Sequence, residues 1–231
     1  MHSRTYWKTL GRFAAVLLAV ASLATSAQAA TISFDFTGSQ GGSYGVGTTD
    51  SRTFTVDGFT VTATAYSYYS GSFHEANLGR WDSGLAVCNS VEMSSGCQSG
   101  EHQVTNNKGF DFVLFEFSGP ADPLEVRIRT TNDYDLDVTY WSGTGPVNLV
   151  GDGTANNYSG SSSTRTVYLN SGVSDWLFFG ASTSNAGIKD GFKIKSLEVD
   201  TYTRQVPEPA SMLLFGVGAL VTLAGRRYYH P

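Results

Sequence analysis

Short runs in which apolar and polar residues alternate recur through the interior of the chain, and clusters of turn residues separate them. The run 32–37 is typical, because Ile32, Phe34 and Phe36 alternate with polar side chains. A β-strand turns successive side chains to opposite faces, so this alternation predicts strands with one buried face. No interior stretch of the sequence has the 3.6-residue period of an amphipathic helix. We therefore predict an all-β fold.

A hairpin is the strongest local prediction. The runs 53–56 and 59–62 flank the dipeptide Asp57-Gly58, and an Asp-Gly pair in this setting favours a two-residue turn. Further strands are predicted at 110–117, 124–130, 136–140, 164–169, 176–179 and 192–199. About nine to eleven strands at this spacing favour a single antiparallel β-sandwich or jelly-roll-like domain. The segments 38–47 and 151–163 are predicted as long surface loops.

Two of these strands carry a specific burial prediction. The residues expected to point inward are Leu124, Val126, Ile128, Leu136, Val138 and Tyr140. The residues that alternate with them are expected to be exposed, and these include Asp135, Asp137 and Thr139.

The N-terminus has the three parts of a secretory signal peptide. Arg4, Lys8 and Arg12 form a basic region, an apolar stretch covers 13–23, and Ala27-Gln28-Ala29 is a small-residue cleavage site. We predict a signal peptide at residues 1–29 with cleavage after Ala29, which leaves an exported domain at residues 30–205.

The C-terminus has the features of a short membrane-anchoring segment. Val206, Pro207, Glu208 and Pro209 precede an apolar run of 15 residues at 210–224, and Arg226 and Arg227 follow it. As a helix this run would measure about 22 Å, which is short for a bilayer core of about 30 Å but compatible with local thinning. The arginines are predicted to mark the cytoplasmic side and stop the segment there. Because prolines keep their neighbourhood out of a helix, Glu208 is expected to be extended and accessible.

This order of a Pro-Glu-Pro motif, an apolar span and a basic end resembles the PEP-CTERM sorting signal of Gram-negative bacteria, here at residues 206–231. The resemblance implies recognition at Pro-Glu-Pro by a membrane-embedded exosortase, which cleaves the chain there. It further implies transient anchoring in the inner membrane, followed by sorting to the cell surface or the extracellular matrix.

The interior is similar to a recurrent type of PEP-CTERM ectodomain. The matching segments are 84–87, 101–104, 110–117 and 190–197. The resemblance implies a β-sandwich surface protein of a kind that generally has no assigned activity.

The exported part is acidic. Residues 31–205 hold 19 Asp or Glu and 10 Lys or Arg, a formal charge of −9. Nucleic acids and anionic lipids are bound through positive surfaces, so this charge argues against both as partners.

Cys88 and Cys97 are the only cysteines of the chain. In an oxidising compartment outside the cytoplasm, two such cysteines are expected to pair as a structural disulfide. The alternative is a metal site or a reactive thiol, and a zinc site would lack a Cys-x-x-Cys motif and enough histidines.

Three patterns raise the question of catalysis or metal binding. The segment 41–45 has the letters of a Gly-x-Ser-x-Gly nucleophile elbow but lacks the strand–helix context that the elbow needs. The pairs His74-Glu75 and Glu101-His102 could serve acid–base or metal chemistry, or could be structural.

Asp133, Asp135 and Asp137 alternate along one predicted strand face. An exposed charged face is the simpler interpretation, and Arg127 and Arg129 on a neighbouring strand could pair with it. The alternative is a contribution to Ca²⁺ binding, although the spacing of an EF-hand is not met.

Several aromatic residues could form a stacking platform for sugars. The candidates for ligand binding are Tyr66, Tyr68, Trp81 and Trp141. Aromatic faces beside polar side chains suit pyranose rings, whose C–H groups stack while their hydroxyls form hydrogen bonds. The alternative is that these are ordinary core and strand aromatics.

The function that we expect is structural or adhesive, within an exopolysaccharide or biofilm matrix. A carbohydrate-binding module is the second hypothesis and a secreted hydrolase the third. We expect no enzymatic activity and no cofactor other than, as one alternative, Ca²⁺.

Overall fold

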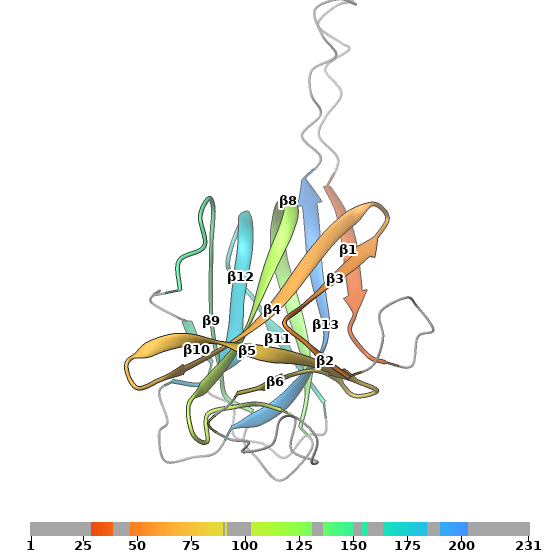
Figure 1. Cartoon of the computed structure of the whole chain (residues 1–231). Coiled ribbons are helices and arrows are strands. Elements are labelled where there is room, and N and C mark those ends of the chain that lie inside the picture. Colours follow the sequence, from red (N-terminus) through yellow and green to blue (C-terminus); the bar gives the residue numbers. More distant parts are fainter. Residues whose placement is uncertain are drawn as a thin grey trace, which may run out of the picture. The chain divides into compact units, whose positions relative to one another are not determined.

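The computed structural model describes residues 29–38, 47–89, 91, 103–130, 136–149, 154–156, 164–183 and 190–202. Residues 29–203 form one compact unit. Within the described residues all regular structure is β-strand (Figure 1), which confirms the all-β prediction.

Thirteen strands occur in the described part of the chain. They are β1 (Ala29–Asp35), β2 (Gly47–Thr49), β3 (Ser51–Val56), β4 (Phe59–Tyr69), β5 (Ser72–Trp81), β6 (Gly84–Cys88), β7 (Val104–Thr105), β8 (Phe110–Arg129), β9 (Val138–Gly143), β10 (Thr154–Asn156), β11 (Arg165–Tyr168), β12 (Ser174–Ala181) and β13 (Gly191–Tyr202). The short strand β10 lies within a segment that the sequence predicts as a loop.

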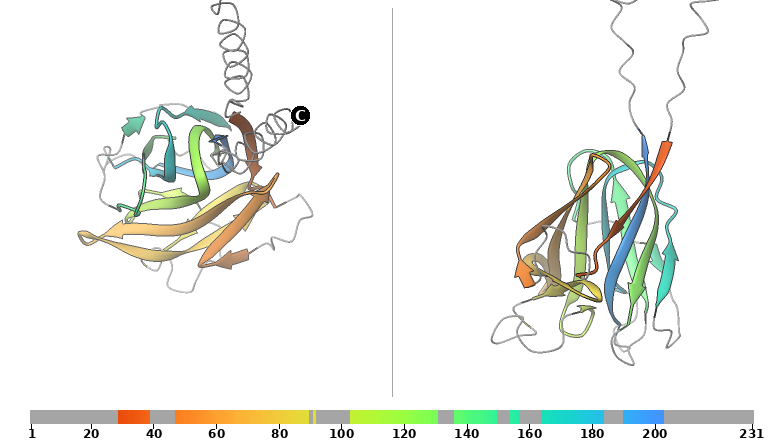
Figure 2. Two further views of the ribbon diagram at one scale, coloured as in Figure 1. Left: turned by 90° about the horizontal axis from the view of Figure 1, so that it is seen from above. Right: turned by 90° about the vertical axis from the view of Figure 1, so that its right-hand side faces the viewer.

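The strands pair antiparallel in the order β1-β13-β6-β5-β4-β8-β12-β9-β10, and β13 also pairs with β8. The pairings therefore close on themselves through β13, β6, β5, β4 and β8. Figure 2 shows these strands around a common interior. The structure is thus all-β, but a sandwich of two separate sheets is not clearly present.

The long strand β8 is the reason for this closure. The sequence predicts two strands at 110–117 and 124–130, whereas the structure joins them into one strand of 20 residues. Its first part pairs with β4 and β12, and its second part pairs with β13 and β11. Pro120 lies between these two pairing regions, and as a residue without a donor N–H it is compatible with the change of partner.

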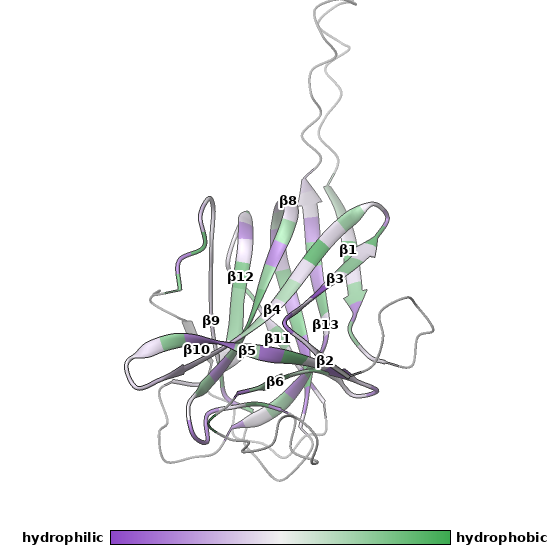
Figure 3. Cartoon of the chain, in the orientation of Figure 1, coloured by the Kyte–Doolittle hydropathy of each residue, from purple (hydrophilic) through white to green (hydrophobic). Residues whose placement is uncertain are grey.

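The main core lies on the inner face of the strands. Ile32, Phe34 and Phe36 are buried as predicted, and the Phe36 ring stacks on Phe115 with centroids 5.4 Å apart. Figure 3 shows apolar residues alternating with more polar ones along β4. The predicted alternation thus places the core correctly.

One inward prediction on β8 is wrong. Val126 and Ile128 are buried, but Leu124 is only half-buried. On β13 the neighbours Glu198 and Val199 pair with Glu125 and Pro123, so Leu124 is an extra residue in the ladder. Such a β-bulge re-aims side chains, and the sequence alternation does not reveal it.

Two tight hairpins shape the β3–β4–β5 region. Asp57 and Gly58 have φ values of 50° and 80°, which confirms the predicted two-residue turn. Ser70 and Gly71 have φ values of 52° and 80° and join β4 to β5. This second turn uses a Ser-Gly pair, a weaker hairpin signal that the sequence analysis did not use.

Candidate functional site

A second apolar cluster lies on the outer face of the strands, opposite the main core. We define this outer face by the positions that alternate with the buried Val61, Ala63 and Ala65 of β4. The buried members of the cluster are Phe112, Leu114, Trp176 and Phe178, and the half-buried members are Tyr66, Tyr68, Phe73, Phe110, Trp141, Val147 and Leu149. The outer face of an antiparallel sheet is often polar, so this cluster identifies the candidate site.

Strand register brings these aromatic residues together. On neighbouring strands, Tyr66 pairs with Phe112 and Tyr68 with Phe110. On β12 and β9, Phe178 pairs with Trp141. Three of the four residues proposed from the sequence for ligand binding, Tyr66, Tyr68 and Trp141, therefore belong to one cluster.

Trp141 is held in a fixed orientation. Its ring stacks on Phe178 with centroids 4.8 Å apart and planes inclined by 14°. The edges of Phe112 and Phe73 approach it with centroids 5.2 and 6.5 Å away. The indole Nε1–H donates a hydrogen bond to the carbonyl oxygen of Asn148 at 3.0 Å. A half-buried tryptophan fixed in this way is a preorganised stacking surface.

The surroundings of Tyr66 are acidic. Glu75 on β5 pairs with Tyr66 on β4 and is exposed. Glu116 is exposed on β8. Burial, and then the charges of Glu75 and Glu116, raise the pKa of the Tyr66 phenol. The phenol therefore remains a neutral donor and acceptor at physiological pH.

Trp176 forms part of the base of the cluster. Its side chain is buried, and its Nε1–H has no hydrogen-bond partner among the residues that the structure describes. The ring lies over Gly143, where a Cβ atom would come within 2.6 Å of it. A buried donor without a partner lowers the stability of the folded state by about 1–3 kcal/mol. The packing of the Trp176 ring therefore includes an unfavourable contribution from its indole N–H.

Trp81, the fourth candidate from the sequence, lies elsewhere. It ends β5, and a Cβ at Gly79 would collide with its ring. The Nζ of Lys193 lies 4.8 Å from the ring centroid, a cation–π geometry. Burial and the charge of Arg129 lower the pKa of Lys193, while Asp82 opposes this shift. This contact accounts for Trp81 without a ligand.

Phe112, Trp176 and Phe178 are members of the outer cluster that were not predicted from the sequence. The sequence predicts only strands for their segments. The signal was the unbroken apolar run 112–115, because a strand that is apolar at successive positions is buried on both faces.

The pair His74-Glu75 is not arranged for acid–base catalysis. The His74 ring stacks on Tyr69 at 4.0 Å, and its Nε2 lies 3.0 Å from the Ser72 hydroxyl. Because neighbours on a strand point to opposite faces, Glu75 lies on the outer face instead. The segment 41–45 and the pair Glu101-His102 lie outside the described residues.

The acidic run 133–137 is described only at its end, and there the predicted exposure is wrong for Asp137. Asp137 is buried, and its backbone N–H donates to Asp190 Oδ1 at 3.3 Å. Leu136, Val138 and Tyr140 are buried as predicted, but Thr139 is buried as well, and its Oγ1 accepts a hydrogen bond from the Thr183 N–H at 3.1 Å. Asp133 and Asp135 lie outside the described residues.

Within the described residues, Arg127 and Arg129 share no ladder with β9, the strand that follows Asp137. Both are on β8, where they face β13 and β11 rather than β9. Among the residues that the structure describes, no group of three or more His, Cys, Asp or Glu is placed to hold a metal ion.

The remaining sequence predictions fall wholly or partly outside the described part of the chain. Cys88 is buried at the end of β6, but Cys97 is not described, so their pairing stays a prediction. The signal peptide, apart from Ala29 at the start of β1, also lies outside, as do the motif 206–209 and Arg226 and Arg227. Within the described ranges, no helix is long and apolar enough to span a membrane.

The C-terminal motif is recognised by comparison with known families. Residues 205–227 match the family model of the PEP-CTERM protein-sorting motif, which confirms the resemblance seen in the sequence. No curated protein and no solved structure matches the chain. The motif implies export, processing by an exosortase and sorting to the cell surface.

Proposed function

We propose that the chain is a surface or matrix protein with a structural or adhesive role rather than a catalytic one. The observation that carries this proposal is the sorting motif at 205–227, which follows directly on the last strand of the β unit. Placement of His74 and Glu75 on opposite faces supports a non-catalytic role, since it separates one of the two candidate acid–base pairs.

We extend the proposal to the maturation of the chain. The run 210–224 anchors the precursor transiently in the inner membrane, and Arg226 and Arg227 hold its cytoplasmic end. Cleavage by the exosortase at Pro207, Glu208 and Pro209 then releases the unit to an exopolysaccharide or biofilm matrix. A disulfide between Cys88 and Cys97 closes a surface loop.

A sandwich-like arrangement remains our proposal for the finer architecture of the unit. It is supported by β8, whose two parts pair with different sets of strands on two sides of the core. The unit is proposed to need no cofactor, with Ca²⁺ as an alternative to be tested in binding assays.

Carbohydrate binding is the second candidate function. It is favoured by the gathering of Tyr66, Tyr68 and Trp141 on one face, with the acidic side chains of Glu75 and Glu116 nearby. Aromatic rings beside hydrogen-bonding groups suit neutral sugars. Such binding would also give the adhesive role a physical mechanism.

Sorting is tested with Glu208→Ala and with deletion of 210–224. We expect the Glu208→Ala precursor to accumulate uncleaved in the membrane fraction, and the deletion to release an unprocessed chain. Immunoblots of membrane, surface and medium fractions measure this. Maturation of both variants to the normal size at the normal destination would overturn the proposal.

Binding and catalysis are tested separately. Pull-down with neutral and anionic polysaccharides, with and without Ca²⁺, tests the second candidate, and retention of no polysaccharide counts against it. Assays of ester and glycoside hydrolysis, repeated with Glu101→Ala and His102→Ala, test the non-catalytic role. An activity that either substitution abolishes would contradict it.

A further inference from the structure

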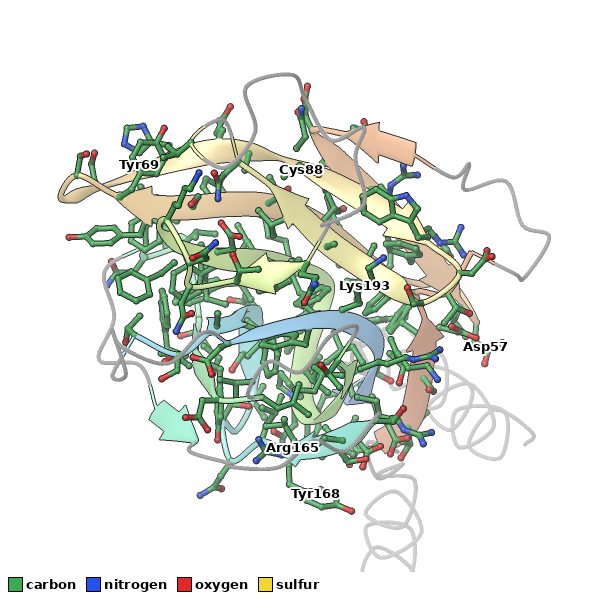
Figure 4. The ribbon with its side chains drawn as sticks, turned by 90° about the horizontal axis from the view of Figure 1, so that it is seen from below. Asp57, Tyr69, Cys88, Arg165, Tyr168 and Lys193 are labelled. Carbon is green, nitrogen blue, oxygen red and sulfur yellow. The ribbon has the colours of Figure 1, made fainter. Side chains whose placement is uncertain are left out.

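The outer face of β4 carries one continuous strip of hydroxyl and aromatic side chains. Its members, in order, are Thr60, Thr62, Thr64, Tyr66 and Tyr68. Residues two apart on a strand are about 6.8 Å apart, so the strip is about 27 Å long. Figure 4 shows Asp57, in the turn before β4, and Tyr69, at its end, on opposite sides of the unit.

The threonine end of the strip is widened by β3. Thr53 Oγ1 lies 3.2 Å from Thr62 Oγ1, and Thr55 Oγ1 lies 3.1 Å from Thr60 Oγ1. In each pair one hydroxyl donates to the other, and in the Thr53–Thr62 pair this leaves one proton and several lone pairs for a further partner. Since β-branched side chains are stiff at χ1, these hydroxyls are held in place before any ligand arrives.

The strip is free of charge in an otherwise acidic unit. Residues 31–205 carry 29 charged side chains, yet the outward positions of β3 and β4 in the described structure are all Ser, Thr or Tyr. Two carboxylates border the strip: Glu75 on β5 pairs with Tyr66, and Glu116 on β8 pairs with Thr62. An anionic chain would be repelled by these carboxylates, whereas a neutral chain would not.

We propose that this strip is the binding site for an extended, neutral polysaccharide that lies along β4. Tyr66 and Tyr68 stack on sugar rings at one end, next to Trp141. The hydroxyls of Thr60, Thr62 and Thr64 form hydrogen bonds with sugar hydroxyls at the other end. This inference rests on the carbohydrate-binding candidate above, and it adds the class of ligand, the direction of the chain and the role of the threonines.

The experiment measures affinities of the full chain for a ladder of cello-oligosaccharides, with hydroxyethylcellulose as the neutral polymer and alginate as the anionic one. We expect affinity to rise with oligosaccharide length until the strip is filled, and alginate to bind more weakly than the neutral polymer. Thr62→Val keeps the shape of the side chain but removes its hydroxyl. It is expected to weaken binding of the longest oligosaccharides about 2- to 10-fold, as for the loss of one hydrogen bond.

The variants separate the two ends of the strip. Tyr66→Ala is expected to weaken the binding of short and long oligosaccharides alike, whereas Thr62→Val affects only the long ones. Thr166→Val is the matched control, because its strand β11 pairs with the second part of β8 and not with β3 or β4, and it should leave every affinity unchanged. Thr53→Val, at an exposed position, replaces Thr62→Val if the latter lowers the melting temperature.

The outcomes distinguish failure of the proposed strip from failure of the carbohydrate-binding candidate on which it rests. If Tyr66→Ala abolishes binding while neither threonine variant changes it, the strip is wrong and the carbohydrate-binding candidate stands. If no neutral probe binds, both fail and the sorting proposal is unaffected. Tighter binding of alginate than of hydroxyethylcellulose would also overturn the inference.

Discussion

The two faces of β4, β8 and β12 are built from the same strands but differ in how completely they are closed. The inner face packs residues such as Val113, Phe115 and Phe179 into the main core, where all three are buried. The outer face has a buried base, including Phe112 and Phe178, under half-buried aromatics such as Tyr66 and Trp141. The inner face is thus closed to solvent, whereas the outer face leaves part of its aromatic surface accessible.

The largest effect is expected from truncation on the inner face. Phe115→Ala removes a fully buried ring that stacks on Phe36, and should lower the free energy of unfolding by about 3–5 kcal/mol. Urea denaturation followed by tryptophan fluorescence measures the loss. A loss below about 1 kcal/mol would show that the inner face does not dominate stability.

Trp141→Ala should act mainly on binding. The ring is half-buried, so we expect a loss of stability smaller than that of Phe115→Ala, about 1–3 kcal/mol. Affinity for hydroxyethylcellulose should fall much more, because the fixed stacking surface is removed. Calorimetric titration and thermal melts separate the two effects, and a stability loss without any change in affinity would make Trp141 a purely structural residue.

Trp176→Phe sharpens the comparison within the outer cluster. The substitution removes the indole N–H that has no partner while keeping an aromatic ring over Gly143. The relief of the buried donor offsets the lost volume, so the free energy of unfolding should change by less than about 1 kcal/mol. Trp176→Ala is the control and should cost about 3–5 kcal/mol. Equal losses in the two variants would contradict the assignment.

The smallest effect concerns pH. The pKa of Tyr66 is raised in the folded state, so above its ordinary value of about 10 the unfolded chain loses the phenolic proton first. Stability then falls as pH rises from about 10 towards the folded pKa. Tyr66→Phe should show a smaller decline over this range in melting temperatures measured between pH 9 and 11. An unchanged pH profile would mean that Tyr66 does not titrate differently in the two states.

Local alternation was enough to predict much of the fold. The burial of Phe34 and Phe36 and the turn at Asp57-Gly58 follow from residues close in sequence. The bulge at Leu124 does not, because it depends on how β13 is registered against β8. The closure of the strands through β8 is likewise a property of pairings between distant segments.

The candidate site was predictable only in part, for a related reason. Tyr66 and Tyr68 share a strand face, so their grouping is visible in the sequence. Trp141 joins them only through β12, whose Phe178 lies beneath it. Trp81 is an aromatic residue beside polar residues in the sequence, as Trp141 is, but its ring lies against Lys193 instead. Residue type therefore identifies candidates, and strand order decides which of them meet.

The pairing of β1 with β13 determines how the unit would respond to mechanical force. Ala29 pairs with Tyr202, and the ladder continues residue by residue to Asp35 and Ser196. A force that pulls Ala29 away from Tyr202 would break the hydrogen bonds of this ladder one after another. A force between the outer face and the end of β13 would instead strain the whole β13–β8 ladder in shear, where many hydrogen bonds resist together.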